Sequence, residues 1–137
     1  MKEKDQPKPG LLITLEGIEG AGKSTQLKFI EAYLKQNAIP VKTTREPGGT
    51  PLGESIRHLV LQQGTQQAPI TKEAELLLFF AARAQHIEQV IKPALQQGQW
   101  VICDRFTETS YAYQGGGRGL NSQVIEQLEQ WIQKATR

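Results

Sequence analysis

The 137-residue sequence has little cysteine, no long apolar run and little net charge, and each of these shortages excludes a class of protein. Its one cysteine, Cys103, excludes an internal disulfide and fits a reducing compartment. No apolar run reaches the roughly 20 residues that a membrane-spanning helix needs, and no signal-peptide pattern opens the chain. The formal net charge of +2 is too small to predict a duplex-binding surface. We therefore expect a cytoplasmic protein with neither nucleic-acid nor membrane partners.

What is present is sufficient for one modest domain with a real core. Apolar residues make up 38% of the sequence and charged residues 22%, an ordinary composition for a globular protein. The polar, proline-bearing residues 1–10 are expected to form a disordered tail. Residues 11–137 form the domain.

Apolar runs and helical periodicities alternate along this domain. Strands are predicted at residues 11–16, 41–45 and 100–104, the first of them as a central strand buried on both faces. Helices are predicted at residues 22–36, 51–62, 73–91 and 122–134. Thr50 caps the second helix, and Pro93 is expected to end the third. This alternation predicts an α/β fold with a parallel sheet flanked by helices.

The stretch GIEGAGKST, residues 17–25, directly follows the first strand. Gly17, Gly22, Lys23 and Ser24 satisfy the pattern G-x-x-x-x-G-K-[ST], in which backbone N–H groups converge on phosphate oxygens. Lys23 can reach the β- and γ-phosphates, and Ser24 can hold Mg²⁺. The predicted phosphate-binding residues are Gly17, Ile18, Glu19, Gly20, Ala21, Gly22, Lys23, Ser24 and Thr25.

Three further segments carry polar chemistry. TREPGGT, residues 44–50, leaves the second strand at its carboxyl end, where parallel sheets bind ligands. In LLLFFAAR, residues 76–83, Phe79 and Arg83 share one helix face and could stack on a base and bond its edge. In DRFTETSYAYQGGGRG, residues 104–119, Asp104 could serve Mg²⁺ or its waters and Arg105 could bridge phosphates.

Simpler explanations stay open for single residues. Phe79 also suits a packed core position, and the dipeptide at 104–105 suits a structural ion pair. Residues 115–117 could be a linker. Cys103 is expected to be a buried packing residue of its strand, and Trp100 and Trp131 are expected in the core. His58 and His86 lie far apart without metal-ligand spacing, so each is expected to be solvated or packed.

Taken together, LEGIEGAGKST, TREPGGTPLGESIR, AELLLFFAARAQHIEQVIKPAL and WVICDRFTETSYAYQGGGRG resemble bacterial thymidylate kinases. The resemblance runs from about Leu11 to the end of the chain. It implies a three-layer P-loop kinase fold in a cytoplasmic homodimer. It also implies transfer of the γ-phosphoryl group of ATP to dTMP with Mg²⁺, which gives dTDP for dTTP biosynthesis.

The resemblance also implies a role for each matching residue. The catalytic residues are Lys23, Asp104 and Arg105, and the Mg²⁺ ligands are Ser24 and Asp104. Phe79 stacks on thymine, and Arg83 bonds the base edge. The other implied dTMP contacts are Glu19 at the 3′-hydroxyl, Glu46 organising the acceptor site, Arg57 and Arg105 at the phosphate, Ser110 and Gln114 at the base, and Tyr113 at the deoxyribose.

The family pattern continues, past the final WIQKATR, with two more strands and an arginine-bearing lid. Residues 11–137 are therefore interpreted as the N-terminal part of one P-loop nucleoside monophosphate kinase domain. Alone, they are expected not to phosphorylate dTMP at a useful rate. A non-catalytic nucleotide-binding protein is the main alternative. A switch GTPase is the other, although no NKxD segment is present and nothing resembling DxxG follows the second strand.

Overall fold

A computed structural model describes residues 8–17, 22–61, 70–106 and 122–133. The elements follow one another as β1 (Leu12–Gly17), α1 (Lys23–Gln36), β2 (Val41–Glu46), α2 (Pro51–Leu61), α3 (Lys72–His86), the π-helical turn η3 (Ile87–Ile91), α4 (Lys92–Gln96), β3 (Trp100–Phe106) and α6 (Ser122–Gln133). Among these residues, no helix has both the length and the apolar character that crossing a bilayer requires.

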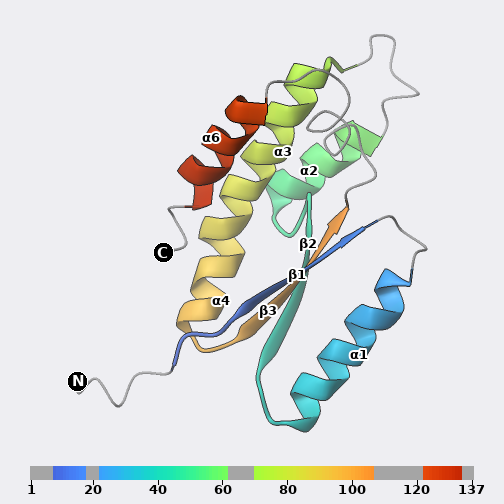
Figure 1. Cartoon of the computed structure of the whole chain (residues 1–137), viewed down its shortest axis with the longest axis vertical. Coiled ribbons are helices and arrows are strands. Elements are labelled where there is room, and N and C mark those ends of the chain that lie inside the picture. Colours follow the sequence, from blue (N-terminus) through green and yellow to red (C-terminus); the bar gives the residue numbers. More distant parts are fainter. Residues whose placement is uncertain (1–7, 18–21, 62–69, 107–121, 134–137) are drawn as a thin grey trace.

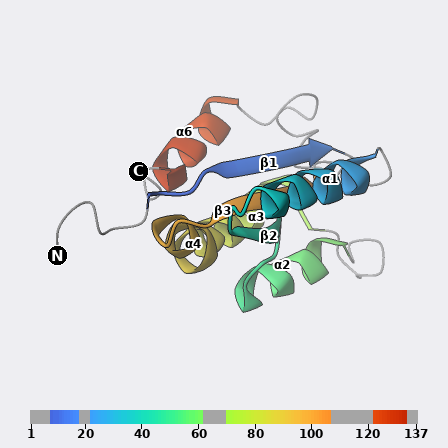
Figure 2. The same ribbon diagram turned by 90° about the horizontal axis from the view of Figure 1, so that it is seen from below.

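The three strands form one parallel sheet in the order β1-β3-β2. Helix α1 packs on one face of the sheet, and the continuous run α3-η3-α4 packs on the other, with α2 and α6 beside α3 (Figures 1 and 2). Helices therefore cover both faces of a parallel sheet, and the predicted fold class is confirmed.

Strand β1 was expected to be a central strand, and in the described residues it lies at an edge of the sheet. In the described part of the chain β3, not β1, is the central strand, and Val101, Ile102 and Cys103 are fully buried. Leu12 on β1 is 38% exposed, because β1 has a described neighbour on one side only. Apolar runs of similar length do not reveal which strand is paired on both sides.

Threonine side chains cap the starts of α2 and α3, and the cap at Thr50 confirms the prediction. The Thr50 hydroxyl accepts a hydrogen bond of 2.8 Å from the Gly53 N–H at the start of α2. The Thr71 hydroxyl accepts one of 3.1 Å from the Ala74 N–H at the start of α3. These bonds satisfy N–H groups that have no partner within the helix.

Pro93 does not end the third helix, contrary to the prediction. Before the proline, the Lys92 N–H donates to the Ile87 carbonyl, five residues back, and η3 is the resulting wider turn. Such a turn relieves the clash that a proline ring makes with the preceding turn, so helix continues through α4 to Gln96.

The core has two parts, one on each side of α3. The larger joins α3, η3, α4 and β3 to Ile132 of α6, and the smaller lies between α2 and α3. Trp131 was expected in the core, but it is 72% exposed. The buried face of α6 instead carries Ile132, with Ile125 and Leu128 packed beside it.

Candidate functional site

The register of the sheet brings three charged side chains together at the carboxyl ends of the strands. Glu16 of β1 and Glu46 of β2 both lie opposite Arg105 of β3. Arg105 donates from Nε to Glu46 Oε1 over 3.1 Å and from Nη1 to Glu16 Oε1 over 3.3 Å. Ligands of open parallel sheets bind at this edge.

Glu46 is the centre of this cluster. Its side chain is 5% exposed, and it accepts hydrogen bonds from Arg83 Nε (3.0 Å), His86 Nδ1 (2.8 Å) and Arg105 Nε (3.1 Å). Burial alone would raise the pKa of Glu46. The His86 hydrogen bond and the two guanidinium charges outweigh burial and lower that pKa from 4.5 to about 2. Glu46 is therefore ionised at neutral pH.

Helix α3 supplies two of these donors because Arg83 and His86 lie three residues apart on one face. The Arg83 guanidinium also lies 5.5 Å from the centre of the Phe80 ring. Phe79 lies in the apolar cluster between α2 and α3 with Ile56, and it is 8% exposed. That burial agrees with a packing role, and thymine stacking by Phe79 stays a prediction.

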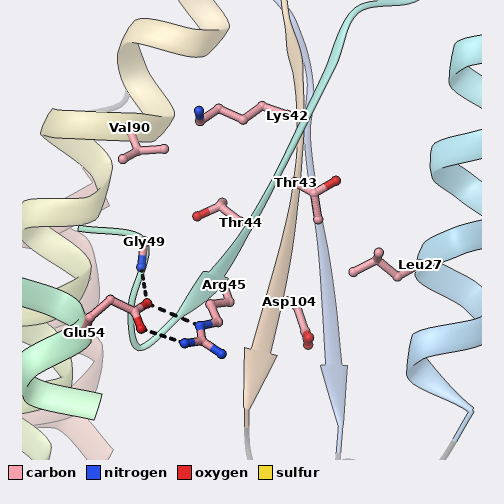
Figure 3. A pocket seen from close by; sticks show the side chains of 9 residues that line it. All are labelled: Leu27, Lys42, Thr43, Thr44, Arg45, Gly49, Glu54, Val90 and Asp104. Atoms are coloured by element: carbon pink, nitrogen blue, oxygen red, sulfur yellow. Dashed lines mark hydrogen bonds and ion pairs between the residues drawn. The ribbon is translucent and has the colours of Figure 1, made fainter. Parts of the chain in front are cut away.

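The EPGGT segment forms a tight turn between β2 and α2. The Glu54 carboxylate accepts hydrogen bonds from Arg45, at 2.6 and 3.2 Å, and from the Gly49 N–H at 2.9 Å (Figure 3). These contacts lower the pKa of Glu54 to about 2. Arg57 Nη1 donates to the Pro47 carbonyl over 3.2 Å, so the turn also holds the arginine that was predicted at the dTMP phosphate.

Asp104 lies on the other face of the sheet from Arg105, since successive side chains of a strand alternate. Asp104 lines a hollow of about 490 Å³ together with Leu27 of α1 and residues of β2 (Figure 3). Ser24 lies three residues before Leu27, on the same face of α1. Asp104 and Ser24 thus carry a carboxylate on β3 and a hydroxyl in the first turn of α1, and oxygen donors of this kind suit Mg²⁺.

The structure describes the two ends of the predicted phosphate loop. β1 ends at Gly17, and α1 begins at Lys23, after Gly22 in a left-handed conformation with φ of 82°. The first turn of α1 carries no acidic residue, so its positive dipole end keeps its attraction for anions. Seven predicted site residues lie outside the described residues: Ile18, Glu19, Gly20, Ala21, Ser110, Tyr113 and Gln114.

Sequence reasoning missed His86. Its ring is fully buried, and it contacts both Glu46 and Thr44. The available signal was its spacing of three from Arg83 on a helix that faces the sheet. Cys103 lies beside these residues and is buried, as predicted. Its burial, and to a smaller extent the negative charge of Glu46, raise the pKa of its thiol to about 12.

Glu46, His86 and Cys103 place their donor atoms within 4.8 Å of one another, a grouping that can hold a metal ion. Here two guanidinium groups already contact the Glu46 carboxylate, and the thiol resists ionisation. A divalent cation would add its charge to theirs, so this cluster does not suit a metal.

Most of the chain matches proteins of one known family. The sequence profile of the thymidylate kinase family matches residues 15–134. The chain belongs to the thymidylate kinase family. It is 57% identical to a thymidylate kinase of Teredinibacter turnerae over 90% of this chain, and 56% identical to one of Alkalilimnicola ehrlichii over 93%. The crystal structure of the Ehrlichia chaffeensis thymidylate kinase superposes with a TM-score of 0.75 at 43% identity, over 90% of this chain and 70% of that one.

The chain spans about 60% of the length of the curated thymidylate kinases that it matches. Within this span lie the phosphate-loop pattern, the EPGGT turn, the α3 arginine and the β3 Asp-Arg pair. The family match over residues 15–134 therefore includes the residues of the charged cluster.

Proposed function

We propose that this chain forms the phosphate-loop and acceptor-binding part of an enzyme that transfers the γ-phosphoryl group of ATP to dTMP, giving dTDP for dTTP biosynthesis. The observation that supports this most strongly is the pair Arg83 and Arg105, held by one buried carboxylate at the carboxyl ends of the strands. Family membership supplies the nucleotide that such a site would take.

The proposed acceptor site lies on the α3 side of the sheet. Arg83 bonds the base edge, Phe79 stacks on thymine, and Arg57 and Arg105 hold the phosphate, with Glu46 keeping two of these arginines in place. Phosphoryl transfer depends mainly on positioning and charge stabilisation, and guanidinium groups held in fixed positions can provide both.

The proposed donor site lies at the start of α1. The loop backbone and Lys23 hold the donor phosphates, and the N-terminus of α1 attracts their charge. Ser24 and Asp104 would hold Mg²⁺, which neutralises charge on the donor phosphates when bound. Asp104 and Arg105 adjoin on β3 but point to opposite faces, so one strand end serves both substrates.

We further propose a cytoplasmic homodimer that uses the outer face of α3 and α6. Leu77 and Trp131 there are 59% and 72% exposed. They border an apolar hollow of about 430 Å³ that also includes Phe80, Leu128 and Ile132. Large apolar side chains gathered on one face are typical of a protein contact, and a second copy of the chain would cover them symmetrically.

The test is titration calorimetry of the 137-residue chain with dTMP and, separately, with Mg·ATP. Lys23→Ala should weaken Mg·ATP binding at least about tenfold and leave dTMP binding within about twofold, since a charge-assisted phosphate contact contributes about 1.5–3 kcal/mol. Any dTMP-dependent ADP release should vanish in the same variant.

Lys28→Ala, an exposed lysine on the same helix, is the matched control and should change neither affinity. Loss of dTMP binding in a folded Lys23→Ala variant would contradict the division into donor and acceptor sides. Binding of both nucleotides without turnover in an extended chain that includes the lid would favour the non-catalytic alternative.

A further inference from the structure

His86 links strand β2 to helix α3 beside the proposed acceptor site. Its fully buried ring contacts Glu46 Oε2 through Nδ1 at 2.8 Å and Thr44 Oγ1 through Nε2 at 2.7 Å. Thr44 and Glu46 are two residues apart on β2, so both side chains face α3. One ring thereby ties the last residues of β2 to helix α3.

The EPGGT turn lies directly against the same ring. Gly49 has φ of 80°, and a Cβ added there would come 2.5 Å from His86 Nε2 and 2.7 Å from Thr44 Oγ1. Only a residue without a side chain permits this approach. The Gly49 N–H is in turn bound by Glu54, so the turn is fixed on one side by the ring and on the other by α2.

The partners of the ring determine which nitrogen carries a proton. The ionised Glu46 carboxylate can only accept, so Nδ1 must carry a hydrogen. In the neutral ring, Nε2 then accepts from the Thr44 hydroxyl. His86 therefore holds one Glu46 oxygen, and the two arginines bond the other oxygen, Oε1.

We propose that His86 is a positioning residue of the acceptor site: by holding Glu46 Oε2 through Nδ1–H, it directs Glu46 Oε1 at Arg83 and Arg105. Without this bond the carboxylate can rotate about its last torsion, so Arg83 and Arg105 lose the fixed position of the oxygen that both contact. The inference rests on the proposed function for the identity of that nucleotide. The arrangement of the ring can be measured without it.

The first measurement is nitrogen NMR of the wild-type chain labelled with ¹⁵N-histidine, near neutral pH. His86 should show a protonated Nδ1 with a slowly exchanging proton, whereas the exposed His58 should show the averaged signals of a solvated ring. An unprotonated Nδ1 in His86 would overturn the proposal, because Glu46 would then have no donor there.

The second measurement is calorimetric dTMP binding by two amide variants that differ only in reach. In His86→Asn the amide replaces Nδ1 and can still donate to Glu46, so dTMP affinity should stay within about threefold. In His86→Gln the amide replaces Nε2 instead, so dTMP affinity should fall about 10- to 100-fold, the scale of a lost hydrogen bond to a charged group. Mg·ATP affinity should change less than twofold in both.

Thr44→Val is the matched control for the other ring nitrogen, since it removes the Nε2 partner and keeps the Nδ1 bond. Like His86→Asn, this variant should keep its dTMP affinity within about threefold of the wild-type value. Equal losses in the Asn and Gln variants, or parallel losses of dTMP and Mg·ATP affinity, would overturn the positioning role and leave His86 as packing. A wild-type chain that binds no dTMP would refute the proposed function, while the NMR result would still decide the arrangement of the ring.

Discussion

Replacing Glu46 by glutamine tests how far one buried carboxylate holds the site together. The substitution keeps size and shape but removes the charge that faces Arg83, Arg105 and His86. A pKa lowered from 4.5 to about 2 corresponds to about 3 kcal/mol of stabilisation, at about 1.4 kcal/mol per tenfold change. We therefore expect Glu46→Gln to lower the free energy of unfolding by about 3 kcal/mol near neutral pH, a large part of a typical total.

The same shift fixes the dependence on pH. Because the pKa of Glu46 is lowered on folding, its stabilisation is complete above about pH 4.5 and is lost as the pH falls toward about 2. The difference between wild type and Glu46→Gln should therefore shrink across that interval. Urea unfolding followed by circular dichroism at several pH values measures it.

Glu54→Gln is the matched control. The pKa of Glu54 is also lowered to about 2, but its side chain is 44% exposed, so solvent screens its pairing with Arg45. Glu54→Gln should therefore lower the free energy of unfolding by less than about 1 kcal/mol. The reasoning would be refuted by a Glu46→Gln loss no larger than that of Glu54→Gln, or by a difference from wild type that stays constant from neutral to acid pH.

Two further predictions concern apolar side chains. Phe79→Ala should weaken dTMP binding by about 1–3 kcal/mol in calorimetry, the scale of base–aromatic stacking, and barely change Mg·ATP binding; an equal loss for both nucleotides would leave Phe79 a core residue only. Trp131→Lys should shift the chain from dimer to monomer in sedimentation velocity, whereas Phe29→Lys on α1, at a position that is also 72% exposed, should not. A dimer that survives Trp131→Lys would place the contact elsewhere.

The sequence predicted the elements and the segments at the strand ends, because those depend on local signals. Alternating apolar runs gave the α/β class, and Thr50 followed by Pro51 gave the start of α2. The position of TREPGGT after one strand and of DRFTETS after another placed Glu46 and Arg105 at the same edge. Parallel strands bring such ends together whatever their order.

The other features of the fold and of the site depend on contacts between distant parts of the chain, which no local sequence pattern specifies. The bond between His86 and Glu46 joins residues 40 positions apart, and only the packing of α3 on β2 brings them together. The central place of β3 follows from the strand order. Trp131 lies outside the core because α6 turns Ile132 inward, and the hydrophobic pattern of that helix fits either residue.

The charges of the cluster explain why a buried acid belongs in a site proposed for an anion. Arg83 and Arg105 contribute two positive charges and Glu46 one negative, so these three groups sum to one positive charge. Glu16 also pairs with Arg105, but its side chain is 56% exposed, and such an ion pair contributes little. Glu46→Gln would make this sum more positive, and by net charge alone it should strengthen dTMP binding. We expect weaker binding, because the carboxylate is what keeps two like-charged guanidinium groups at one point of the strand edge. Orientation therefore outweighs net charge here, and tighter dTMP binding by a folded Glu46→Gln variant would show the opposite.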